Sequence, residues 1–299
     1  MTVGKARVLL TGPGGLLGSH LLPRLAGKYD VTGVSRKAPS LKNAQSSFVS
    51  IDLSDSSTLK RFLDDTQFDM VINCAAMADV DLCERERDKA LKINVEAARV
   101  MAAHARKNDI ILIHISTDYL FDGLSGPYSE DAAPNPINFY GRTKLLAEEA
   151  IRESGCKYTI VRTNHLYGNL PDGPSKQIKW LLQAADRNEP ILAATDLSNN
   201  PTWSGNLADA IVELLESDIR GVINLGGSDY LSRYEFALAA ADILGLDRGR
   251  IRKASKAELN MLAARPSKAG LKIDLMKSVL RTRATGVSEG LKKVHAGWR

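Results

Sequence analysis

A tyrosine and a lysine four residues apart, Tyr140 and Lys144, are the residues of this chain best suited to acid–base chemistry. Residues at this spacing on a helix share one face, so the two side chains can act together. A nearby ammonium lowers the pKa of a phenol, which lets the phenol give or take a proton near neutral pH. Alternatively, Tyr140 is only a core aromatic of an amphipathic helix. The pair alone is weak evidence for catalysis, so the interpretation depends on the motifs that accompany it.

A second signal lies upstream, where two hydroxyl residues end an apolar run. Ser116 and Thr117 follow Ile110–Ile115, which has the pattern of a buried strand. Open α/β sheets bind ligands at the carboxyl ends of strands, so either hydroxyl could hydrogen-bond a substrate carbonyl. We expect Tyr140 to protonate that carbonyl as a hydride arrives, while its lysine partner tunes the phenol and holds the nicotinamide ribose. His114, inside the run, has the spacing of a packed strand residue rather than of a catalyst.

A glycine-rich turn near the N-terminus is suited to binding a hydride donor. The segment Thr11-Gly12-Pro13-Gly14-Gly15-Leu16-Leu17-Gly18 follows the first predicted strand and opens a helix, which is the context of a dinucleotide-binding turn. Gly12 permits the tight turn, Gly15 the close approach of a pyrophosphate, and Gly18 the packing of helix on strand. The free N–H groups and the dipole of the helix N-terminus favour phosphates. The alternative is an ordinary strand–helix loop.

The end of the second predicted strand indicates which dinucleotide binds. An NAD-preferring site usually carries Asp or Glu here, whereas this chain has Ser35, Arg36 and Lys37. A hydroxyl and two cations suit the 2′-phosphate of NADP, and Arg36 can bind it in forked geometry. The two cations could equally be solvated loop charges. After the third strand, Asp52 and Leu53 are expected to flank the adenine, although Asp52 could instead cap the next helix.

Strand and helix patterns alternate along the first half of the chain. This alternation predicts a Rossmann-type, doubly wound α/β fold, with a parallel sheet and helices on both faces. The predicted strands are Arg7–Leu10, Val31–Val34, Phe48–Ile51, Met70–Asn73, Ile110–Ile115 and Tyr158–Val161. The predicted helices between them are Leu16–Ala26, Ser56–Asp64, Lys89–Arg106 and Thr143–Glu153.

The pattern loosens in the second half of the chain. We expect a nucleotide-binding domain over residues 1–163 and a smaller, mainly substrate-binding α/β lobe over residues 164–299, some segments of which return to the main sheet. The active-site cleft should lie between the two. The predicted elements here are helices at Ile178–Arg187, Asn206–Glu216, Ser232–Leu244 and Lys256–Leu262, and strands at Ile191–Ala193 and Val222–Leu225.

Composition and charge are those of a soluble globular protein. The 299 residues are 44% hydrophobic and 25% charged, and the net charge of +5 is spread along the chain. No nucleic-acid-binding motif accompanies this mild charge, and no uncharged run approaches the roughly 18 residues of a membrane span. The three cysteines are odd in number and far apart, which argues against a disulfide framework or a zinc site. We expect a cytoplasmic protein with no nucleic-acid, membrane or metal partner; a homodimer is compatible with these features.

Further motifs extend over nearly the whole chain. They are Asn73–Asp81, Ile93–Val95, Ser116–Gly123, Tyr128–Asp131, Tyr140–Lys144, Arg162-Thr163, Leu166–Gly168, Pro201-Thr202, Ser232–Ala237 and Arg265-Pro266. With the glycine turn, they resemble the extended short-chain dehydrogenase/reductase superfamily and, more closely, its dTDP-4-dehydrorhamnose reductase group. The resemblance implies NADPH-dependent reduction of a 4-keto-6-deoxy nucleotide sugar, with Thr117, Tyr140 and Lys144 as the catalytic residues.

The resemblance also implies that Cys74, Ala75 and Ala76 line the nicotinamide half of the cofactor site. Small residues at a strand end also allow simple close packing, so their size does not separate the two interpretations. Asn94 would orient backbone or water near the site, or bridge a helix to its neighbour. The expected cofactor-binding residues are Gly12, Gly14, Gly15, Leu16, Leu17, Gly18, Ser35, Arg36, Asp52, Leu53, Cys74, Ala75, Ala76, Asn94, Tyr140, Lys144 and Thr163.

The chain departs from the group where the substrate would be recognised. Asn164-His165 stands where the group usually carries a Ser-Trp pair, and Thr195–Asn200 replaces an Asp-Gln-x-Gly run. The acids that hold magnesium in some members are not matched. Polar residues after strand ends are expected to contact the sugar, although each could instead satisfy loop backbone. The expected substrate contacts are Ser116, Asp118, Asn164, His165, Asn200 and Thr202.

Three kinds of relative with similar motifs perform other tasks. Dehydratases carry an Asp-Glu pair after the catalytic threonine, but here Asp118 is followed by Tyr119. Epimerases recycle a bound NAD, whereas the basic end of the second strand favours NADPH as a consumed donor. The regulatory subunit of methionine adenosyltransferase binds NADP as a partner protein, and retention of Tyr140 and Lys144 does not exclude that role. Reduction of a keto-sugar nucleotide is favoured, with the regulatory subunit and the epimerase as alternatives.

Overall fold

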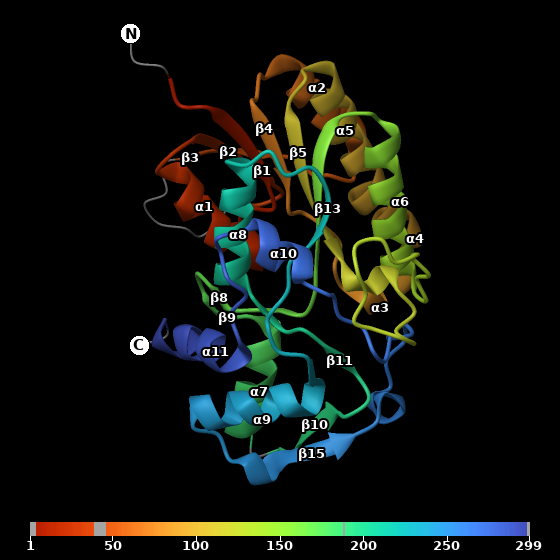
Figure 1. Cartoon of the computed structure of the whole chain (residues 1–299), viewed down its shortest axis with the longest axis vertical. Coiled ribbons are helices and arrows are strands. Elements are labelled where there is room, and N and C mark those ends of the chain that lie inside the picture. The colour runs from red at the N-terminus through yellow and green to blue at the C-terminus, as the bar shows by residue number, and fades with distance from the viewer. Residues whose placement is uncertain (1–3, 39–45, 188, 298–299) are drawn as a thin grey trace.

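A seven-stranded parallel sheet forms the centre of the protein (Figure 1). The computed structural model describes residues 4–38, 46–187 and 189–297. The strands lie in the order β3-β2-β1-β4-β5-β6-β13, and every pairing is parallel. Their bounds are β1 Arg7–Thr11, β2 Asp30–Ser35, β3 Ser46–Ser50, β4 Met70–Asn73, β5 Ile111–Thr117, β6 Lys157–Thr163 and β13 Gly221–Asn224. The strand order reverses between β1 and β4, which is where doubly wound sheets bind ligands.

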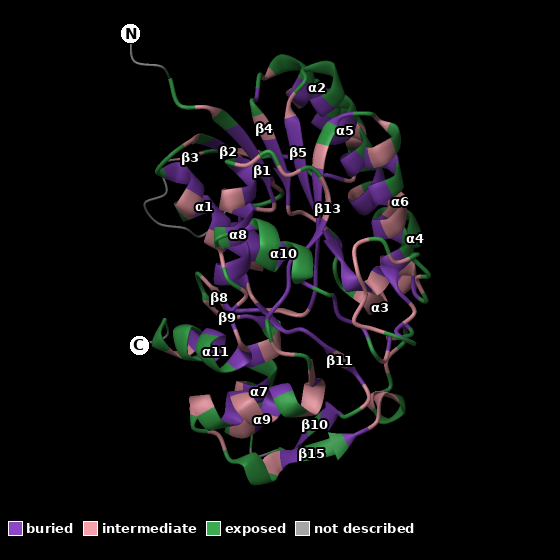
Figure 2. Cartoon of the chain, viewed as in Figure 1, coloured by how far each residue is buried: buried purple, intermediate pink, exposed green. Residues whose placement is uncertain are grey.

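Helices cover both faces of this sheet, and the buried strands between them stand out in Figure 2. One face is covered by α1 Leu16–Ala26, α8 Ser204–Leu215 and α10 Asp274–Val279, and the other by α2 Ser56–Asp65, α5 Ala97–Lys107 and α6 Phe139–Glu153. Leu17, Leu21 and Leu25 of α1 share one buried face at helical spacing, and they pack in one cluster with Ile211 and Leu214 of α8. Amphipathic spacing therefore fixes how these helices dock. The short segments α3 Val80–Arg85, α4 Arg87–Leu91 and η1 Lys92–Glu96 precede α5.

A smaller lobe lies below the sheet in the view of Figure 1 and has its own apolar core. Its helices are α7 Lys176–Asp186, α9 Arg233–Leu244 and α11 Val287–Ala296, with short turns η3 Arg248–Arg250 and η4 Lys256–Leu259. Its strands are only two to four residues long and pair two by two. The pairs are β10 Ile191–Ala194 with β15 Ile251–Ala254, β11 Ser198–Asn199 with β14 Leu231–Ser232, β12 Thr202–Trp203 with β7 Leu166–Tyr167, and β8 Asn169–Leu170 with β9 Gly173–Pro174. No helix within the described ranges is long and apolar enough to cross a membrane.

The doubly wound parallel sheet predicted from the sequence is confirmed, with local differences. Helix α6 begins at Phe139, four residues earlier than predicted, because the Asn138 side chain caps it by accepting from the Gly141 N–H at 2.8 Å. The helix predicted at Lys256–Leu262 is only the short turn η4. Residues after 163 are shared between the two parts, because β13, α8 and α10 lie against the main sheet.

A buried ion pair fastens α6 to the sheet. The side chains of Arg162 on β6 and Glu148 on α6 are 2% and 0% exposed. Two guanidinium nitrogens donate to the two carboxylate oxygens, Nε at 3.0 Å and Nη2 at 2.8 Å. Arg152, nearer the surface, also donates to Glu148, at 2.7 Å. Both buried charges are thus compensated, and α6 is held at a fixed height over the sheet.

We expect Glu148→Ala to lower the free energy of unfolding by about 3–5 kcal/mol, because it strands the Arg162 charge in the core. Arg152→Ala is the matched control: its side chain is 34% exposed, and losing such a pair should cost less than about 1 kcal/mol. Chemical denaturation of the two variants and the wild type checks this. Equal losses in both variants would contradict the assignment of the stabilising pair.

Candidate active site

A cavity of about 470 Å³ opens at the carboxyl ends of the strands, between the sheet and the smaller lobe. The glycine turn, the ends of β4, β5 and β6, and helix α6 form the wall on the side of the sheet. Segments after residue 163 form the remainder. The lining residues used below are Gly12, Gly15, Leu16, Leu17, Gly18, Cys74, Ala76, Ser116, Thr117, Asp118, Tyr119, Tyr140, Lys144, Thr163, Asn164, His165, Lys176, Asn199 and Arg233.

A second cavity of about 290 Å³ adjoins the first and extends toward the second strand. Its lining includes Ser35, Arg36, Asp52, Leu53 and Ala75, and it shares glycine-turn and β4-end residues with the first cavity. Asp52 also serves its own loop, since its Oδ1 accepts from the Ser54 N–H at 2.9 Å. Asp55, not Asp52, caps helix α2. The two cavities together make an elongated site whose far end carries the Arg36 cation.

Two residues expected to bind cofactor lie outside both cavities. Gly14 borders a separate surface hollow beside Lys176. Asn94 is 2% exposed, and its amide accepts from the Met77 N–H at 2.8 Å and donates to the Thr143 hydroxyl at 2.9 Å. Asn94 therefore braces the loop after β4 against α6, which is the bridging alternative considered from the sequence.

The structure brings Thr117, Tyr140 and Lys144 to one wall of the larger cavity. Thr117 ends β5, and its hydroxyl accepts from the Tyr119 N–H at 3.2 Å and donates to Asp118 at 3.3 Å. Tyr140 packs edge-on against Tyr119, with ring centroids 6.0 Å apart. All three residues thus border the same space, as acid–base catalysis on a bound carbonyl requires.

The expected lowering of the Tyr140 pKa by an ammonium is corrected by the structure. Burial raises the pKa of the Tyr140 phenol above its usual range, and the neighbouring Thr117 hydroxyl only partly opposes this. Lys144 turns elsewhere: its Nζ donates to the Ile115 carbonyl at 2.6 Å and contacts His114 Nε2 at 2.9 Å. The phenol is therefore fully protonated at neutral pH, which is the form that can give a proton.

Asp118 is a second proton-active group beside the catalytic candidates. Its side chain is buried, and burial raises the pKa of the carboxyl to about 7, while hydrogen bonds from the Gly270 N–H and the Thr117 hydroxyl lower it. The Gly270 N–H lies 3.3 Å from Oδ2. A carboxyl that titrates near neutral pH therefore adjoins Thr117.

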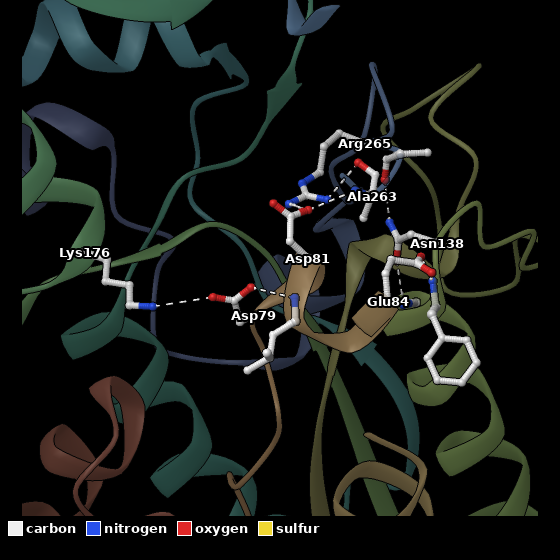
Figure 3. A network of polar contacts seen from close by, with 11 residues as sticks. Asp79, Asp81, Glu84, Asn138, Lys176, Ala263 and Arg265 are labelled. Atoms are coloured by element: carbon white, nitrogen blue, oxygen red, sulfur yellow. Dashed lines mark hydrogen bonds and ion pairs between the residues drawn. The ribbon is translucent and has the colours of Figure 1, made fainter. Parts of the chain in front are cut away.

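Two contacts fix the backbone at Tyr140 (Figure 3). Glu84 of α3 accepts from the Phe139 N–H at 2.7 Å, and Asn138 accepts from the Gly141 N–H at 2.8 Å. These N–H groups belong to the first turn of a helix and have no partner within it. Capping both of them holds the residue between them in place.

The same helix α3 reaches across to the second half of the chain (Figure 3). Asp81 accepts from the Arg265 guanidinium at 2.9 Å and from the Ala263 N–H at 3.0 Å. Asp79, which caps α3, lies 3.8 Å from the ammonium of Lys176 on α7. Helix α3, which was not predicted from the sequence, thus links the helix that carries Tyr140 to the segment around Arg265 and to Lys176, which lines the cavity.

The expected substrate residues divide into two groups. Ser116, Asp118, Asn164 and His165 line the cavity, but Asn200 and Thr202 do not. Asn200 instead accepts from the Leu271 N–H at 2.8 Å, and Thr202 donates to Asn164 at 3.1 Å. Both are buried loop-bracing residues, so their polar groups are already used in holding the cavity wall.

Several polar atoms on the cavity wall have no partner among the described residues. They are Ser116 Oγ, Thr163 Oγ1 and His165 Nε2. Burial lowers the pKa of His165 well below its usual range, so the ring is neutral. Its backbone φ of 35° is in the left-handed region, which turns the ring against Phe236 at 5.1 Å between centroids. A polar ligand would satisfy these atoms.

Asn199, a polar loop residue of the kind expected to contact substrate, also lines the cavity, and so does Arg233, which was not predicted from the sequence to lie there. Arg233 is the first residue of α9, and the capping box formed by Ser232 and Glu235 fixes where that helix starts. The S-x-x-E signature in the sequence could have located it. No ion pair joins the Arg233 guanidinium to a carboxylate in the described part of the chain, so its charge is open to an anionic ligand. Across the described ranges, no three His, Cys, Asp or Glu side chains gather as a metal site.

Residues 6–298 match the model of the family described as RmlD substrate binding domain. A dTDP-4-keto-6-deoxy-D-glucose reductase of Streptomyces niveus is 33% identical over 252 residues, 82% of this chain and 81% of that protein. The beta subunit of methionine adenosyltransferase 2 of Bos taurus is 27% identical over 300 residues, 98% of this chain and 88% of that protein. The solved structure of dTDP-4-dehydrorhamnose reductase from Bacillus anthracis in complex with NADP is similar with a TM-score of 0.87 and 27% identity, covering 98% of this chain and 99% of that one.

We expect Arg36→Ala to weaken binding of NADPH far more than binding of NADH, because only NADPH offers a 2′-phosphate to the guanidinium at the end of the second cavity. Loss of a charge-assisted hydrogen bond costs roughly 1.5–3 kcal/mol, or about one to two decades in affinity. Calorimetric titration with each dinucleotide measures both constants. Equal weakening would assign a structural role to Arg36, and no change would leave it a solvated loop residue.

Proposed function

Because the chain belongs to the RmlD substrate binding domain family, we propose that it reduces a 4-keto-6-deoxy nucleotide sugar with NADPH. The observation that carries the proposal is the convergence of Thr117, Tyr140 and Lys144 with the glycine turn on one cavity. Likeness to a named keto-sugar reductase and to a reductase solved with NADP supports the same reaction and cofactor. The protein is thus an NADP-dependent oxidoreductase acting on the keto group of a nucleotide sugar.

The residues of the elongated site fit a dinucleotide. A Cβ at Gly18 would lie 2.1 Å from the Gly12 carbonyl oxygen, so the helix start can sit this close to the turn only with glycine. The backbone N–H groups there would hold the pyrophosphate. Ser35 and Arg36 would hold the 2′-phosphate, and Cys74 and Ala76 would line the nicotinamide end. When bound, NADPH supplies the hydride.

Tyr140 acts as the general acid in this proposal. The phenol, kept protonated by burial, gives its proton to the carbonyl oxygen as the carbonyl carbon is reduced, and water later restores the proton. The Thr117 hydroxyl hydrogen-bonds the same oxygen and orients it. One hydride and one proton convert the ketone into an alcohol, so the atoms and charges balance.

The sugar nucleotide occupies the part of the cavity away from the glycine turn. The buried polar atoms of Ser116, Thr163 and His165 that have no hydrogen-bond partner in the part of the chain that the structure describes would form hydrogen bonds with hydroxyls of the sugar ring. Arg233 would hold the diphosphate, which is the strongest anion of the substrate. Its guanidinium is close enough to the Tyr119 phenol to oppose the rise that burial causes in the pKa of that phenol, and Tyr119 packs against Tyr140. Arg233 thus borders the same part of the cavity as Tyr119, the aromatic neighbour of Tyr140.

One alternative has an observation in its favour. The likeness to a methionine adenosyltransferase beta subunit extends over 98% of the chain. A regulatory subunit of this kind would bind NADP without turning over a sugar. NADPH oxidation with dTDP-4-keto-6-deoxyglucose, set against co-purification with a methionine adenosyltransferase, separates the two: turnover supports the reductase, and a stable complex without turnover supports the subunit.

We expect Tyr140→Phe to lower kcat by about 10²–10⁴, the usual contribution of general acid catalysis. Phenylalanine keeps the ring and its packing but has no proton to give. NADPH binding should be retained, which fluorescence titration of the variant checks. Near-wild-type turnover would rule out Tyr140 as the acid.

We expect Arg233→Met to raise KM for the nucleotide sugar by about one to two decades, because methionine keeps the stem and removes the charge that holds the diphosphate. KM for NADPH should change little. Lys176→Met is the matched control, since this second cation on the cavity wall is 89% exposed and paired with Asp79. A large effect of Lys176→Met with none from Arg233→Met would move the diphosphate to α7.

A further inference from the structure

Three hydrogen bonds meet at the carboxyl end of β5, on the wall of the larger cavity. The Thr117 hydroxyl accepts from the Tyr119 N–H at 3.2 Å and lies 3.3 Å from Asp118 Oδ1. The other oxygen of this carboxyl, Oδ2, accepts from the Gly270 N–H at 3.3 Å. Thr117 is 6% exposed and Asp118 is 1% exposed, and both line the cavity. With so little of either side chain exposed, the few hydrogen bonds that they make decide where their protons point.

The Gly270 N–H determines which oxygen of the Asp118 carboxyl is better placed to carry a proton. A backbone N–H only donates, so Oδ2 is occupied as an acceptor. A proton on this carboxyl therefore belongs on Oδ1, the oxygen that faces Thr117. The 3.3 Å contact between the two side chains then has two possible directions. An ionised carboxyl accepts the Thr117 proton, whereas a protonated carboxyl donates to the Thr117 oxygen.

The direction of this contact decides what Thr117 can offer a substrate. Its hydroxyl has one proton and two lone pairs, and the Tyr119 N–H takes one lone pair in either case. When Asp118 is ionised, it takes the Thr117 proton, and only a lone pair is left for the cavity. When Asp118 is protonated, it takes the second lone pair, and the Thr117 proton is left for the cavity. A ketone oxygen only accepts, so it can bond Thr117 in the second state alone.

The same state directs the Tyr140 proton. The phenol of Tyr140 adjoins the Thr117 hydroxyl. A Thr117 lone pair that is open to the cavity would accept the phenol proton and turn it away from the substrate. When both lone pairs are occupied, the phenol proton is available to the ketone. A protonated carboxyl at Asp118 thus leaves two protons for one oxygen, as general acid catalysis on a carbonyl needs.

We propose that Asp118 works as a neutral carboxylic acid, a positioning residue that donates from Oδ1 to Thr117 and turns the Thr117 proton toward the ketone of the substrate. The inference deepens the proposed function and rests on it, since it concerns how the reductase site holds its carbonyl. It makes reduction depend on the proton of Asp118. That proton stays on Asp118, so the hydride of NADPH and the proton of Tyr140 still account for the whole reaction.

The charges around Asp118 agree with this assignment. Burial raises the pKa of its carboxyl to about 7, against the opposing effects of its two hydrogen bonds and of the Arg233 guanidinium on α9. The other titratable groups that face it are phenols, whose pKa values burial raises, so they add no charge at neutral pH. They belong to Tyr119, Tyr140 and Tyr230. Both protonation states of Asp118 are therefore populated near neutral pH, and the pH selects between them.

The pH dependence of kcat/KM for dTDP-4-keto-6-deoxyglucose, at saturating NADPH, tests the proposal. This ratio reports the groups of the enzyme before the sugar binds. The active form carries the Asp118 proton, so activity is present below the pKa of about 7 and is lost as the pH rises through it. We expect kcat/KM to fall at least about tenfold between about pH 6 and pH 8. A kcat/KM that is constant or rises over this range overturns the proposal.

Asp118→Asn separates this carboxyl from every other titrating group. The amide has the hydrogen-bonding pattern of the protonated acid, because its oxygen can accept from the Gly270 N–H while its nitrogen donates to Thr117 at any pH. We expect the fall in kcat/KM between about pH 6 and pH 8 to shrink to about twofold or less. The remainder belongs to Lys144, whose pKa burial lowers to about 8. A fall of the wild-type size in Asp118→Asn overturns the proposal.

Asp122→Asn is the matched control. This carboxyl lies four residues further along, accepts from the Tyr128 hydroxyl at 2.7 Å and lines neither cavity. Hydrogen bonds, first of all the one from Tyr128, lower the pKa of Asp122, so it stays ionised over the whole range. The variant should keep the wild-type pH profile. Loss of the pH dependence in both variants contradicts the assignment to Asp118.

Carbon NMR of the full-length protein labelled with ¹³C-aspartate observes the same group without any substrate. The resonance that is missing from Asp118→Asn identifies Asp118. We expect a carboxyl that is protonated at about pH 6 and ionises as the pH rises through about 7. A protonated Asp118 in a protein that reduces no keto sugar would count against the proposed function. Reduction by a protein whose Asp118 is already ionised at about pH 6 would count against this inference alone.

Discussion

The close approach of two strand ends is the constraint on which the site depends. Strands β1 and β4 pair as far as Thr11 and Asn73. After these two residues, each of the two segments must turn away from the sheet. Gly12 makes its turn with φ at 68°, and a Cβ there would lie 3.1 Å from the Ala75 Cα. Glycine accepts both the dihedral angle and the proximity. Without that contact, the Ala75 N–H could not donate to the Thr11 hydroxyl at 3.1 Å, and the glycine turn would not face the nicotinamide end of the same cavity.

Burial sets the electrostatic character of the reacting end of the cavity. It favours the uncharged form of four groups there: it raises the pKa of Tyr140 and of Asp118 and lowers that of Lys144 and His165. The wall around the proposed carbonyl is therefore polar, and the groups whose pKa values burial shifts favour their uncharged forms. The Arg233 guanidinium lies beside this wall, close enough to act on Asp118 and Tyr119.

The parts of the molecule that depend on local pattern could be predicted from the sequence. The strands of the main sheet, the glycine turn and the shared cavity of Thr117, Tyr140 and Lys144 follow from periodicity, glycine spacing and helix geometry, whereas most short strands of the smaller lobe were not predicted. Helix α3 could not be predicted, because it is short and is held by contacts to Phe139 and Arg265, far along the chain. Asn200 and Thr202 look like substrate contacts in sequence, but their partners come from loops that only the tertiary fold brings near. The direction of the Tyr140 pKa shift could not be predicted either, because it depends on how deeply the phenol is buried.

The path of the chain between the sheet and the smaller lobe restricts how the two can move. After β6 the chain enters the lobe, returns for α8 and β13, leaves again for α9 and comes back for α10 before ending in α11. A single flexible joint would allow one rigid body to swing about another, but these several crossings act as parallel tethers. Opening and closing of the cavity must therefore come from sliding and from local loop adjustment, and the two halves cannot be cut apart as independently folding units.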